Sequence, residues 1–457
     1  MSVPEIDQQI GIEVYATKTA GLGGAIRRAV EDFVVDEVLV DGSKAMAEKN
    51  MAKPPLGATE TRQRFLLCVL VKRNWDTFVA LKNVARQLGI DQNRISFAGI
   101  KDAKAITAQH VSIDGISEED AARVDVKDVE LRPIGYVREP LSAFYMQGNN
   151  FTAKIKEISY PRGIVEERVA KIASEIAAAA GIPNFYGHQR FGTTRAITHI
   201  VGEALVQGNV EQAAMTFLAK PSEYEHPASR QARRDLQDSQ DFNKALKVFP
   251  VQLRFERLML AHLVENPGDF SGAFRMLPLK LRMLFVQAWQ SFLFNRFLSA
   301  RIRNGFSIGK AEIGDYVVNV DRSGMPMIRT GKVVDGLNAS EIDKLIAEGR
   351  MRVSLPIFGV KQKLSEGTMG ELEKRILEEE GVEANGFRIP ALPEIGGKGE
   401  LRAAVSPVIN FALEAVSSYS NELESQAEVG FMLLRGSYAT ILLREIMKPS
   451  NLISAGF

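Results

Sequence analysis

The chain has 457 residues, of which 45% are hydrophobic and 25% charged, and its formal net charge is +1. This balance is typical of a globular protein and excludes a disordered, collagen-like or coiled-coil chain. The longest apolar run, residues 65–71, is far shorter than the roughly 20 residues that span a bilayer. The N-terminal residues lack the basic and apolar segments of a secretory signal peptide. We therefore expect no membrane association, and the length predicts two or three domains.

The cysteine and histidine content argues against disulfide and metal chemistry. Cys68 is the single cysteine, so an intrachain disulfide and a cysteine-based zinc site are excluded, and a reducing, cytoplasmic setting fits. None of the five histidines stands at ligand spacing from another, and the sequence contains no P-loop or Gly-x-Ser-x-Gly elbow. We predict no metal site.

Charge is distributed unevenly along the chain. Residues 61–110 contain nine Lys or Arg against three acidic residues, a local net charge of +6, and the next twenty residues carry seven acids against two bases. Such a segment can form a basic face that binds a phosphate backbone on an otherwise neutral protein. It can equally be an ordinary solvated surface, and this feature taken alone favours that second interpretation.

The first part of the chain alternates strand and helix signals. Residues 33–40 and 65–71 are predicted strands, and the second is apolar enough to be buried on both faces. A helix is predicted to run through Leu88, because its apolar positions share one face. Asn74 is the predicted N-cap of this helix. A short strand is predicted at 95–98.

A second strand–helix unit follows. Residues 150–156 alternate between apolar and polar side chains, which predicts a half-buried strand. The apolar stripe of residues 165–176 predicts a helix, and Gly181 and Pro183 are expected to end it, with the glycine as its C-cap.

The middle of the chain, residues 181–406, is more helical and is punctuated by Pro and Gly. A strand at 431–434 and a helix from about Tyr438 are predicted near the C-terminus. Strand-rich ends around a helical middle suggest one domain with another inserted into it.

The segment that runs from Phe97 to Gln109 carries the most evident chemistry. A strand is predicted to end at Ala98, Gly99 permits an unusual backbone angle, and Asp102 then lies in a loop at the strand edge. A lone carboxylate at such a place can act as a nucleophile. Asp102 can also be the N-cap of a helix formed by the small residues that follow, and the residues alone favour this structural role.

Six segments, in the same order, resemble motifs of the TruD family of tRNA pseudouridine synthases, in its longer, archaeal-like branch. They are EDFVV at 31–35, FAGIKD with AITAQ at 97–109, GNNF at 148–151, PNFYGHQRFG at 183–192, QSFLFN at 290–295, and GSYAT with RE at 436–445. Two aromatic residues are exchanged in the fourth segment, and Tyr438 stands where the family has Phe.

The resemblance implies an α+β pseudouridine-synthase fold, a mixed and mainly antiparallel sheet flanked by helices, with an inserted α/β TRUD domain. The catalytic domain is expected over 1–180 plus 407–457 and the insertion over 181–406. The implied activity is that of an isomerase that converts uridine at position 13 of tRNA into pseudouridine. Because the product is an isomer of the substrate, no cofactor is expected, and tRNA is the expected partner.

The resemblance also assigns the site. Asp102 is the implied nucleophile, and a carboxylate with an ordinary pKa of about 3.9 is already ionised at neutral pH. Lys101 or Arg190 is expected as the nearby cation that keeps it charged. Phe33, Asn149, Phe151 and Tyr438 are the implied contacts to a flipped-out base, although strand alternation alone makes Phe33 and Phe151 core residues. Possible phosphate contacts are Lys101, Lys104, Arg190 and Arg195.

Two other functions stay open on the sequence. One is a catalytically inactive RNA-binding protein of the same fold. The other is a carboxylate glycosidase, which normally needs two acids that flank one bond. No second acid evidently accompanies Asp102, although Glu31 or Asp32 could approach it in space.

Overall fold

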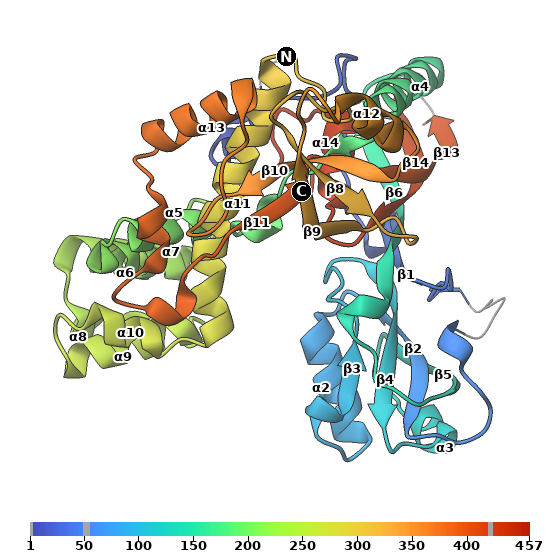
Figure 1. Cartoon of the computed structure of the whole chain (residues 1–457). Coiled ribbons are helices and arrows are strands. Elements are labelled where there is room, and N and C mark those ends of the chain that lie inside the picture. Colours follow the sequence, from blue (N-terminus) through green and yellow to red (C-terminus); the bar gives the residue numbers. More distant parts are fainter. Residues whose placement is uncertain (1–2, 49–54, 419–423) are drawn as a thin grey trace. The chain divides into compact units, whose positions relative to one another are not determined.

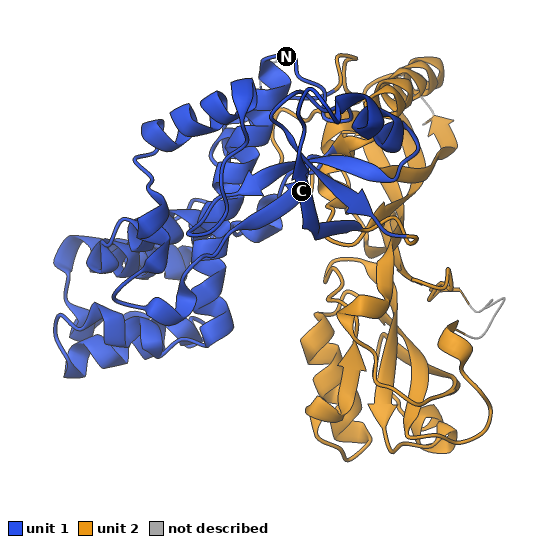
Figure 2. Ribbon diagram, viewed as in Figure 1, with its two compact units in different colours: residues 1–16, 183–321, 326–405 blue, residues 17–182, 322–325, 406–457 orange. Residues whose placement is uncertain are grey.

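The computed structural model describes residues 3–48, 55–418 and 424–457, and the chain divides into two compact units (Figure 2). Unit 1 consists of Met1–Ala16, Pro183–Asp321 and Pro326–Val405, and unit 2 of Thr17–Ile182, Arg322–Met325 and Ser406–Phe457. The sequence predicts an insertion over 181–406, and unit 1 takes up the chain at Pro183 and ends at Val405. Unlike the prediction, the N-terminal segment belongs with the inserted part.

Side chains of the helix α11 (Leu279–Arg303) explain why the N-terminal segment belongs to unit 1. The side-chain amide of Asn295 donates to the carbonyl of Ile10 at 2.9 Å, and the hydroxyl of Ser299 donates to the carbonyl of Gly11 at 2.8 Å. Both side chains are buried. Buried polar groups of this kind must find partners, and the N-terminal backbone supplies them.

Unit 2 is built on an eight-stranded sheet with the order β13-β14-β6-β1-β4-β2-β5, to which β3 is added through β4 (Figure 1). The strands are β1 (Phe33–Leu39), β2 (Phe65–Arg73), β3 (Ile95–Phe97), β4 (Ile106–Asp114), β5 (Val129–Val137), β6 (Met146–Ile158), β13 (Val408–Ser418) and β14 (Ser425–Leu434). β1 and β4 run parallel, and the other described pairs of this sheet are antiparallel. The sheet is therefore mixed and mainly antiparallel.

Helices of unit 2 accompany this sheet. They are α2 (Thr77–Gln87), α3 (Glu118–Ala122), α4 (Arg162–Ala178) and α14 (Ala439–Met447). Buried side chains of α2 join those of β2 and β4 in one apolar cluster. Leu81 and Val84 of the predicted stripe are buried in it, whereas Phe78, which was also predicted to lie on this face, is 49% exposed. The predicted cap of α2 is wrong: the carboxylate of Asp76 accepts from the amides of Phe78 and Val79, whereas Asn74 has φ +57° and turns the chain before the helix.

The apolar stripe of α4 is buried as predicted, but its C-terminal end is built differently. The left-handed residue is Ala180, with φ +62°, and the amide of Gly181 donates to the carbonyl of Ile176 at 2.9 Å. The two residues thus form a Schellman-type end in which Ala takes the place usual for Gly. Gly181 is needed for a different reason, because a Cβ there would lie 2.2 Å from the carbonyl oxygen of Ser406.

Unit 1 combines helices with a four-stranded sheet of order β11-β10-β8-β9. Its helices are α1 (Glu5–Gln8), α5 (Thr198–Val206), α6 (Val210–Ala219), α7 (Pro227–Ser239), α8 (Phe242–Val248), α9 (Arg254–Glu265), α10 (Phe270–Arg275), α11, α12 (Ala339–Ala347) and α13 (Gly367–Glu379). Its strands are β8 (Tyr316–Val320), β9 (Pro326–Val333), β10 (Met351–Ile357) and β11 (Glu400–Ala403). Two short strands, β7 (Ile182–Pro183) and β12 (Val405–Ser406), mark two of the points where the chain passes between units. Of the helices that the structure describes, none has the length and apolarity that a membrane crossing requires.

Candidate active site

The loop between β3 and β4 carries the predicted nucleophile. Residues 98–105 form no helix, so the interpretation of Asp102 as a helix N-cap is wrong. Gly99 does not have a positive φ. A Cβ at this position would lie 2.9 Å from the sulfur of Met146, so glycine here allows this side chain to pack closely rather than supplying an unusual backbone angle.

The carboxylate of Asp102 pairs with a cation that the sequence analysis missed. The Nη2 atom of Arg27 lies 3.3 Å from Oδ1 of Asp102, with 36% of the Asp102 side chain exposed. The guanidinium of Arg27 also lies over the ring of Phe33, 4.3 Å from its centroid. Lys101, one of the two expected cations, does not take this place, because its ammonium pairs with Glu37. Arg27 stands four residues before the EDFVV segment. Its own backbone is left-handed, with φ +57°.

The main chain of Asp102 is held from beneath by a buried lysine. The ammonium of Lys72 donates to the carbonyl of Asp102 at 2.6 Å and to the carbonyl of Trp75 at 2.7 Å. Lys72 has no exposed surface. Its burial lowers its pKa to about 8, although the neighbouring charges of Asp102 and Asp76 oppose this shift. Lys72 therefore ties the reactive loop to β2.

Lys101 is also buried, which corrects its predicted role. Its Nζ atom lies 2.6 Å from Oε2 of Glu37, and the Lys101 side chain is only 1% exposed. Glu37 also accepts from the backbone amide of His110 at 3.0 Å. Burial alone would raise the pKa of Glu37, but Lys101 and His110 lower it below its ordinary value. An ammonium fixed in this way is not available to an RNA phosphate, so Lys101 is a structural cation.

Three further hydrogen bonds fix the backbone of the loop. The hydroxyl of Thr77 donates to the carbonyl of Lys101 and accepts from its amide, both at 3.2 Å. The side-chain amide of Gln109 donates to the carbonyl of Gly99 at 3.1 Å. Together with Lys72, these contacts determine where the carboxylate of Asp102 stands before any substrate binds.

Aromatic rings continue from Asp102 and Arg27 into the sheet. The ring centroids of Phe33 and Phe151 lie 6.0 Å apart, and Phe151 stacks on Phe431 at 5.3 Å. Phe33 has no exposed surface, and 6% of Phe151 is exposed. Phe33 therefore supports the guanidinium of Arg27, and its expected contact to a base stays a prediction. Phe431, which was not predicted, supports Phe151.

Asn149 and Tyr438 come from two different segments of unit 2. Asn149 lies two residues before Phe151 on β6, so both side chains are on one face. Its Oδ1 atom is buried and has no hydrogen-bond partner among the described residues. Tyr438 is half-buried and immediately precedes α14, at the end of the segment that follows β14.

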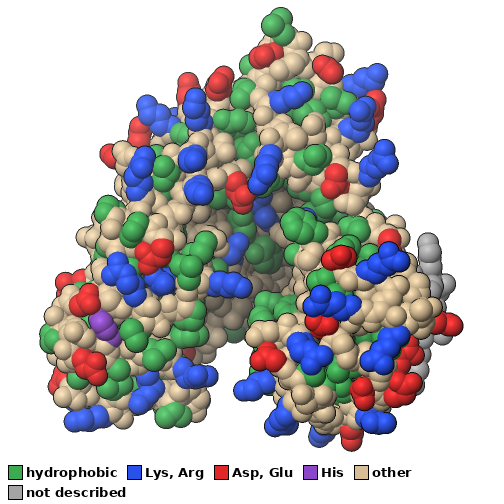
Figure 3. Space-filling model, turned by 60° about the horizontal axis from the view of Figure 1, so that its bottom comes forward, with side chains coloured by type: hydrophobic (Ala, Val, Ile, Leu, Met, Phe, Trp, Pro, Cys, Tyr) green, Lys and Arg blue, Asp and Glu red, His purple; other side chains and the backbone are tan. Residues whose placement is uncertain are grey.

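The remaining predicted cations differ in accessibility. Lys104 is exposed on the same loop as Asp102. Arg195 is not available to RNA, because its guanidinium donates to carbonyl groups of unit 1 and the side chain is only 12% exposed. Arg190 belongs to unit 1 and lines a cavity there. On the face drawn in Figure 3, basic and acidic side chains are interspersed.

Comparisons with known proteins agree with this architecture. A relative from Methanosarcina acetivorans, named "Probable tRNA pseudouridine synthase D", is 38% identical over 99% of both chains. One from Pyrococcus furiosus with the same name is 35% identical over 95% of this chain and 98% of its own. A crystal structure of a Methanosarcina mazei protein described as TruD superimposes with a TM-score of 0.84, at 36% identity, over 98% of this chain and 99% of that one.

These similarities confirm the predicted fold class, the mixed α+β fold of a pseudouridine synthase with its sheets flanked by helices. A family model described as "tRNA pseudouridine synthase D (TruD)" matches residues 9–446. The chain belongs to the TruD family.

Proposed function

We propose that the protein is a tRNA pseudouridine synthase that converts uridine at position 13 of tRNA into pseudouridine, with Asp102 as its nucleophile. The observation that supports this most is the partly exposed carboxylate of Asp102, which pairs with Arg27. The loop that carries Asp102 has its backbone fixed by buried groups. We assign the catalytic domain to unit 2, and the activity to the cytoplasm.

The chemistry that this site supports is a rearrangement of one nucleoside. A carboxylate oxygen of Asp102 attacks C1′, the C1′–N1 bond breaks, and uracil leaves with the bonding electron pair. After the base has turned, C5 forms a bond to C1′ and the Asp102 carboxylate is released. The C5 proton is lost and N1 gains a proton, so the product is an isomer of the substrate. A carboxylate is already charged at neutral pH and needs no partner base for the attack.

The base must leave its stack before it reaches Asp102, which costs a few kcal/mol. Phe151 and Tyr438 are the proposed contacts to its faces, and one aromatic contact contributes about 1–3 kcal/mol. Asn149 is the proposed reader of the base edge. Its Oδ1 atom is buried without a donor, and the N3–H of uracil supplies one.

The partner is a folded RNA, which proteins recognise through its shape, its phosphates and its unstacked bases. Lys104 is the proposed phosphate contact next to the reacting nucleotide, since it is exposed on the loop that carries Asp102. No cofactor is assigned, because the proposed reaction changes neither oxidation state nor composition.

Arg27 provides a first test of the site. Arg27→Ala removes the partner of the Asp102 carboxylate and uncovers Phe33. We expect kcat to fall about 10- to 100-fold, which is the rate loss typical of a misplaced reacting group. Arg27→Lys is expected to recover only part of the rate, because an ammonium does not reproduce a guanidinium that both pairs and stacks. Rates measured at saturating tRNA check both variants, and equal rates for Ala and wild type would contradict the role of Arg27.

The substrate position is tested with the wild-type protein. A tRNA transcript with uridine at position 13 is incubated with the enzyme, and pseudouridine is mapped along the RNA. A matched transcript with cytidine at position 13 serves as the control. We expect pseudouridine at position 13 of the first transcript and none in the second. Product at another position contradicts the site assignment, and the absence of any product contradicts the activity. Release of free uracil would indicate a glycosidase.

A further inference from the structure

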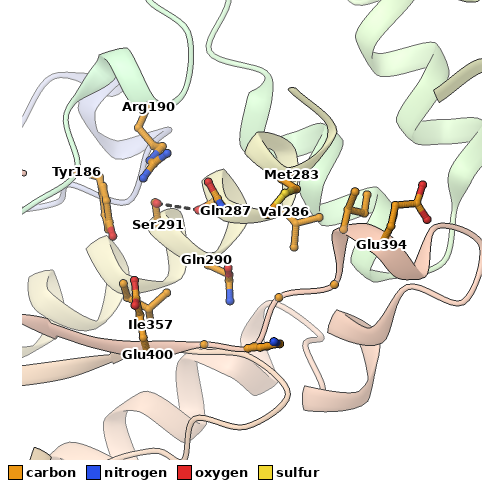
Figure 4. A pocket seen from close by; sticks show the side chains of 15 residues that line it. Tyr186, Arg190, Met283, Val286, Gln287, Gln290, Ser291, Ile357, Glu394 and Glu400 are labelled. Carbon is orange, nitrogen blue, oxygen red and sulfur yellow. Dashed lines mark hydrogen bonds between the residues drawn. The ribbon is translucent and has the colours of Figure 1, made fainter. Parts of the chain in front are cut away.

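Unit 1 contains a cavity of about 470 Å³ that the proposed reaction does not use. It lies between α11, the end of β10, the start of β11 and the segment Glu394–Gly399. Figure 4 shows Gln287, Gln290 and Ser291 of α11 with their side chains around this space, and Arg190 and Tyr186 beside them. A volume of this size accommodates one nucleotide.

The guanidinium of Arg190 faces this cavity without an anionic partner. Among the residues that the structure describes, none forms a hydrogen bond or an ion pair with the Arg190 side chain, and its Nε atom is buried. Its described side-chain contact is the ring of Tyr186, 5.1 Å from the guanidinium carbon. A partly buried guanidinium carries five N–H donors, and such donors are normally satisfied. An oxyanion in the cavity would satisfy those of Arg190 that face it.

The other charges of the cavity favour an anion. Lys398 is exposed at its wall and has no carboxylate partner among the described residues. The carboxylate of Glu394 is already engaged by the guanidinium of Arg282. Glu400, which is exposed, is the remaining acidic group of the lining. Arg402, two residues further along β11, places a second guanidinium 4.0 Å from the centroid of the Tyr186 ring.

Polar groups suited to a sugar or a base stand beside these cations. The side-chain nitrogen of Gln290 donates to the carbonyl of Phe358 at 2.7 Å, which fixes the amide and leaves its oxygen without a donor among the described residues. Glycine at position 397 permits this packing, because a Cβ there would lie 2.9 Å from Nε2 of Gln290. The amide is therefore held in one orientation at the wall of the cavity.

We propose that this cavity binds one phosphate-bearing nucleotide of the RNA substrate, other than the uridine that reacts with Asp102. Arg190 and Lys398 hold the phosphate, and the oxygen of Gln290 accepts a hydrogen bond from the ribose or the base. The inference rests on the proposed function for the identity of the RNA. It assigns to unit 1 a binding role that is separate from the chemistry.

Equilibrium binding of tRNA over a series of salt concentrations tests the proposal without requiring turnover. Arg190→Gln and Lys398→Gln are each expected to weaken binding at low salt by about 5- to 20-fold. Each is also expected to reduce the slope of log K against log salt by about 0.7–0.9, the effect of one lost phosphate contact. KM should rise by the same factor as Kd. Lys398 is exposed, so its substitution keeps the test valid if Arg190→Gln alters folding.

Two further variants are the controls. One removes a negative charge from the cavity, and the other removes a positive charge outside it. Glu400→Gln removes the remaining acid of the cavity and is expected to strengthen tRNA binding, whereas Lys247→Gln, on the exposed surface of α8, should leave the salt slope unchanged. The proposal is overturned if Arg190→Gln and Lys398→Gln retain the wild-type salt slope. It is equally overturned if AMP binds wild type and not Arg190→Gln while tRNA binding is unaffected, since the cavity then serves a free nucleotide. A wild-type protein without pseudouridine activity contradicts the proposed function but not this binding result.

Discussion

Asp102→Asn is expected to abolish pseudouridine formation while tRNA binding persists. Asn has nearly the same shape as Asp and still reaches Arg27, but its amide is a very weak nucleophile. Loss of a nucleophile typically lowers kcat by roughly a thousandfold or more. Pseudouridine formation under single-turnover conditions measures the rate, and equilibrium binding of the same tRNA measures the affinity, which should change by no more than about threefold.

Asp125→Asn is the control for this experiment, because Asp125 is exposed in the same unit and makes no described side-chain contact. It should leave kcat at the wild-type value. If Asp102→Asn retains more than about one percent of the wild-type rate, Asp102 is not the nucleophile. If Asp102→Asn instead loses binding together with turnover, the side chain contributes to RNA affinity and the mechanistic assignment has to be revised.

Lys72→Met is expected to produce the second large effect, at a residue that is buried beneath the site. The substitution leaves the carbonyl groups of Asp102 and Trp75 without their donor, at a cost of about 1–3 kcal/mol each. Removal of a buried charge offsets part of this cost. The loop is then free to shift, and a shift of about 1 Å at a reacting group costs about 100-fold in rate. We expect kcat to fall by that factor and KM to change little.

The pH dependence distinguishes a positioning role of Lys72 from general destabilisation. The pKa of Lys72 is lowered by burial from 10.5 to about 8. The folded enzyme therefore loses this proton at about pH 8, whereas the unfolded chain keeps it to about 10.5. Between these values the unfolded state binds more protons, so the contribution of Lys72 to the free energy of unfolding rises with pH. Below pH 8 this contribution is independent of pH.

Activity should respond in the opposite direction to stability. A neutral amine donates weaker hydrogen bonds than an ammonium, so the wild-type kcat is expected to decline as the pH rises through about 8. The residual activity of Lys72→Met should lack this decline. Lys82→Met, an exposed lysine of the same unit, is the matched control and should retain both the rate and the pH profile of wild type. A Lys72→Met enzyme with wild-type kcat would exclude the positioning role.

Local patterns predicted the elements that surround the site. The strand at 65–71, the stripe of α4 and the loop that carries Asp102 each depend on periodicity or on a short motif, and the structure contains them. Two details at helix ends were wrong. Asp76 rather than Asn74 caps α2, and Ala180 rather than Gly181 adopts the left-handed conformation after α4. Several residues near a helix end can supply the same capping geometry, and tertiary packing decides between them.

The partners within the site could not be predicted in the same way. Arg27 meets Asp102 across 75 residues of sequence, and Lys101 turns inward to Glu37 rather than outward to solvent. Both contacts follow from the parallel pairing of β1 with β4, which no local pattern encodes. A basic residue in a basic segment is expected at the surface. The two lysines next to Asp102, Lys72 and Lys101, are the exceptions, because buried carbonyl and carboxylate groups surround them.

The anchored loop of Asp102 has a consequence for the choice of RNA. Since Lys72, Thr77 and Gln109 already immobilise this loop, little adaptation is left to the protein, and the nucleic acid must deform to meet it. The RNA therefore bears the free-energy cost of flipping the base out of its stack. This cost is smallest for a pyrimidine that stacks weakly on its neighbours or has no pairing partner. The rigid loop of Asp102 thereby favours uridines that are locally mobile, before any hydrogen bond to the edge of the base is formed.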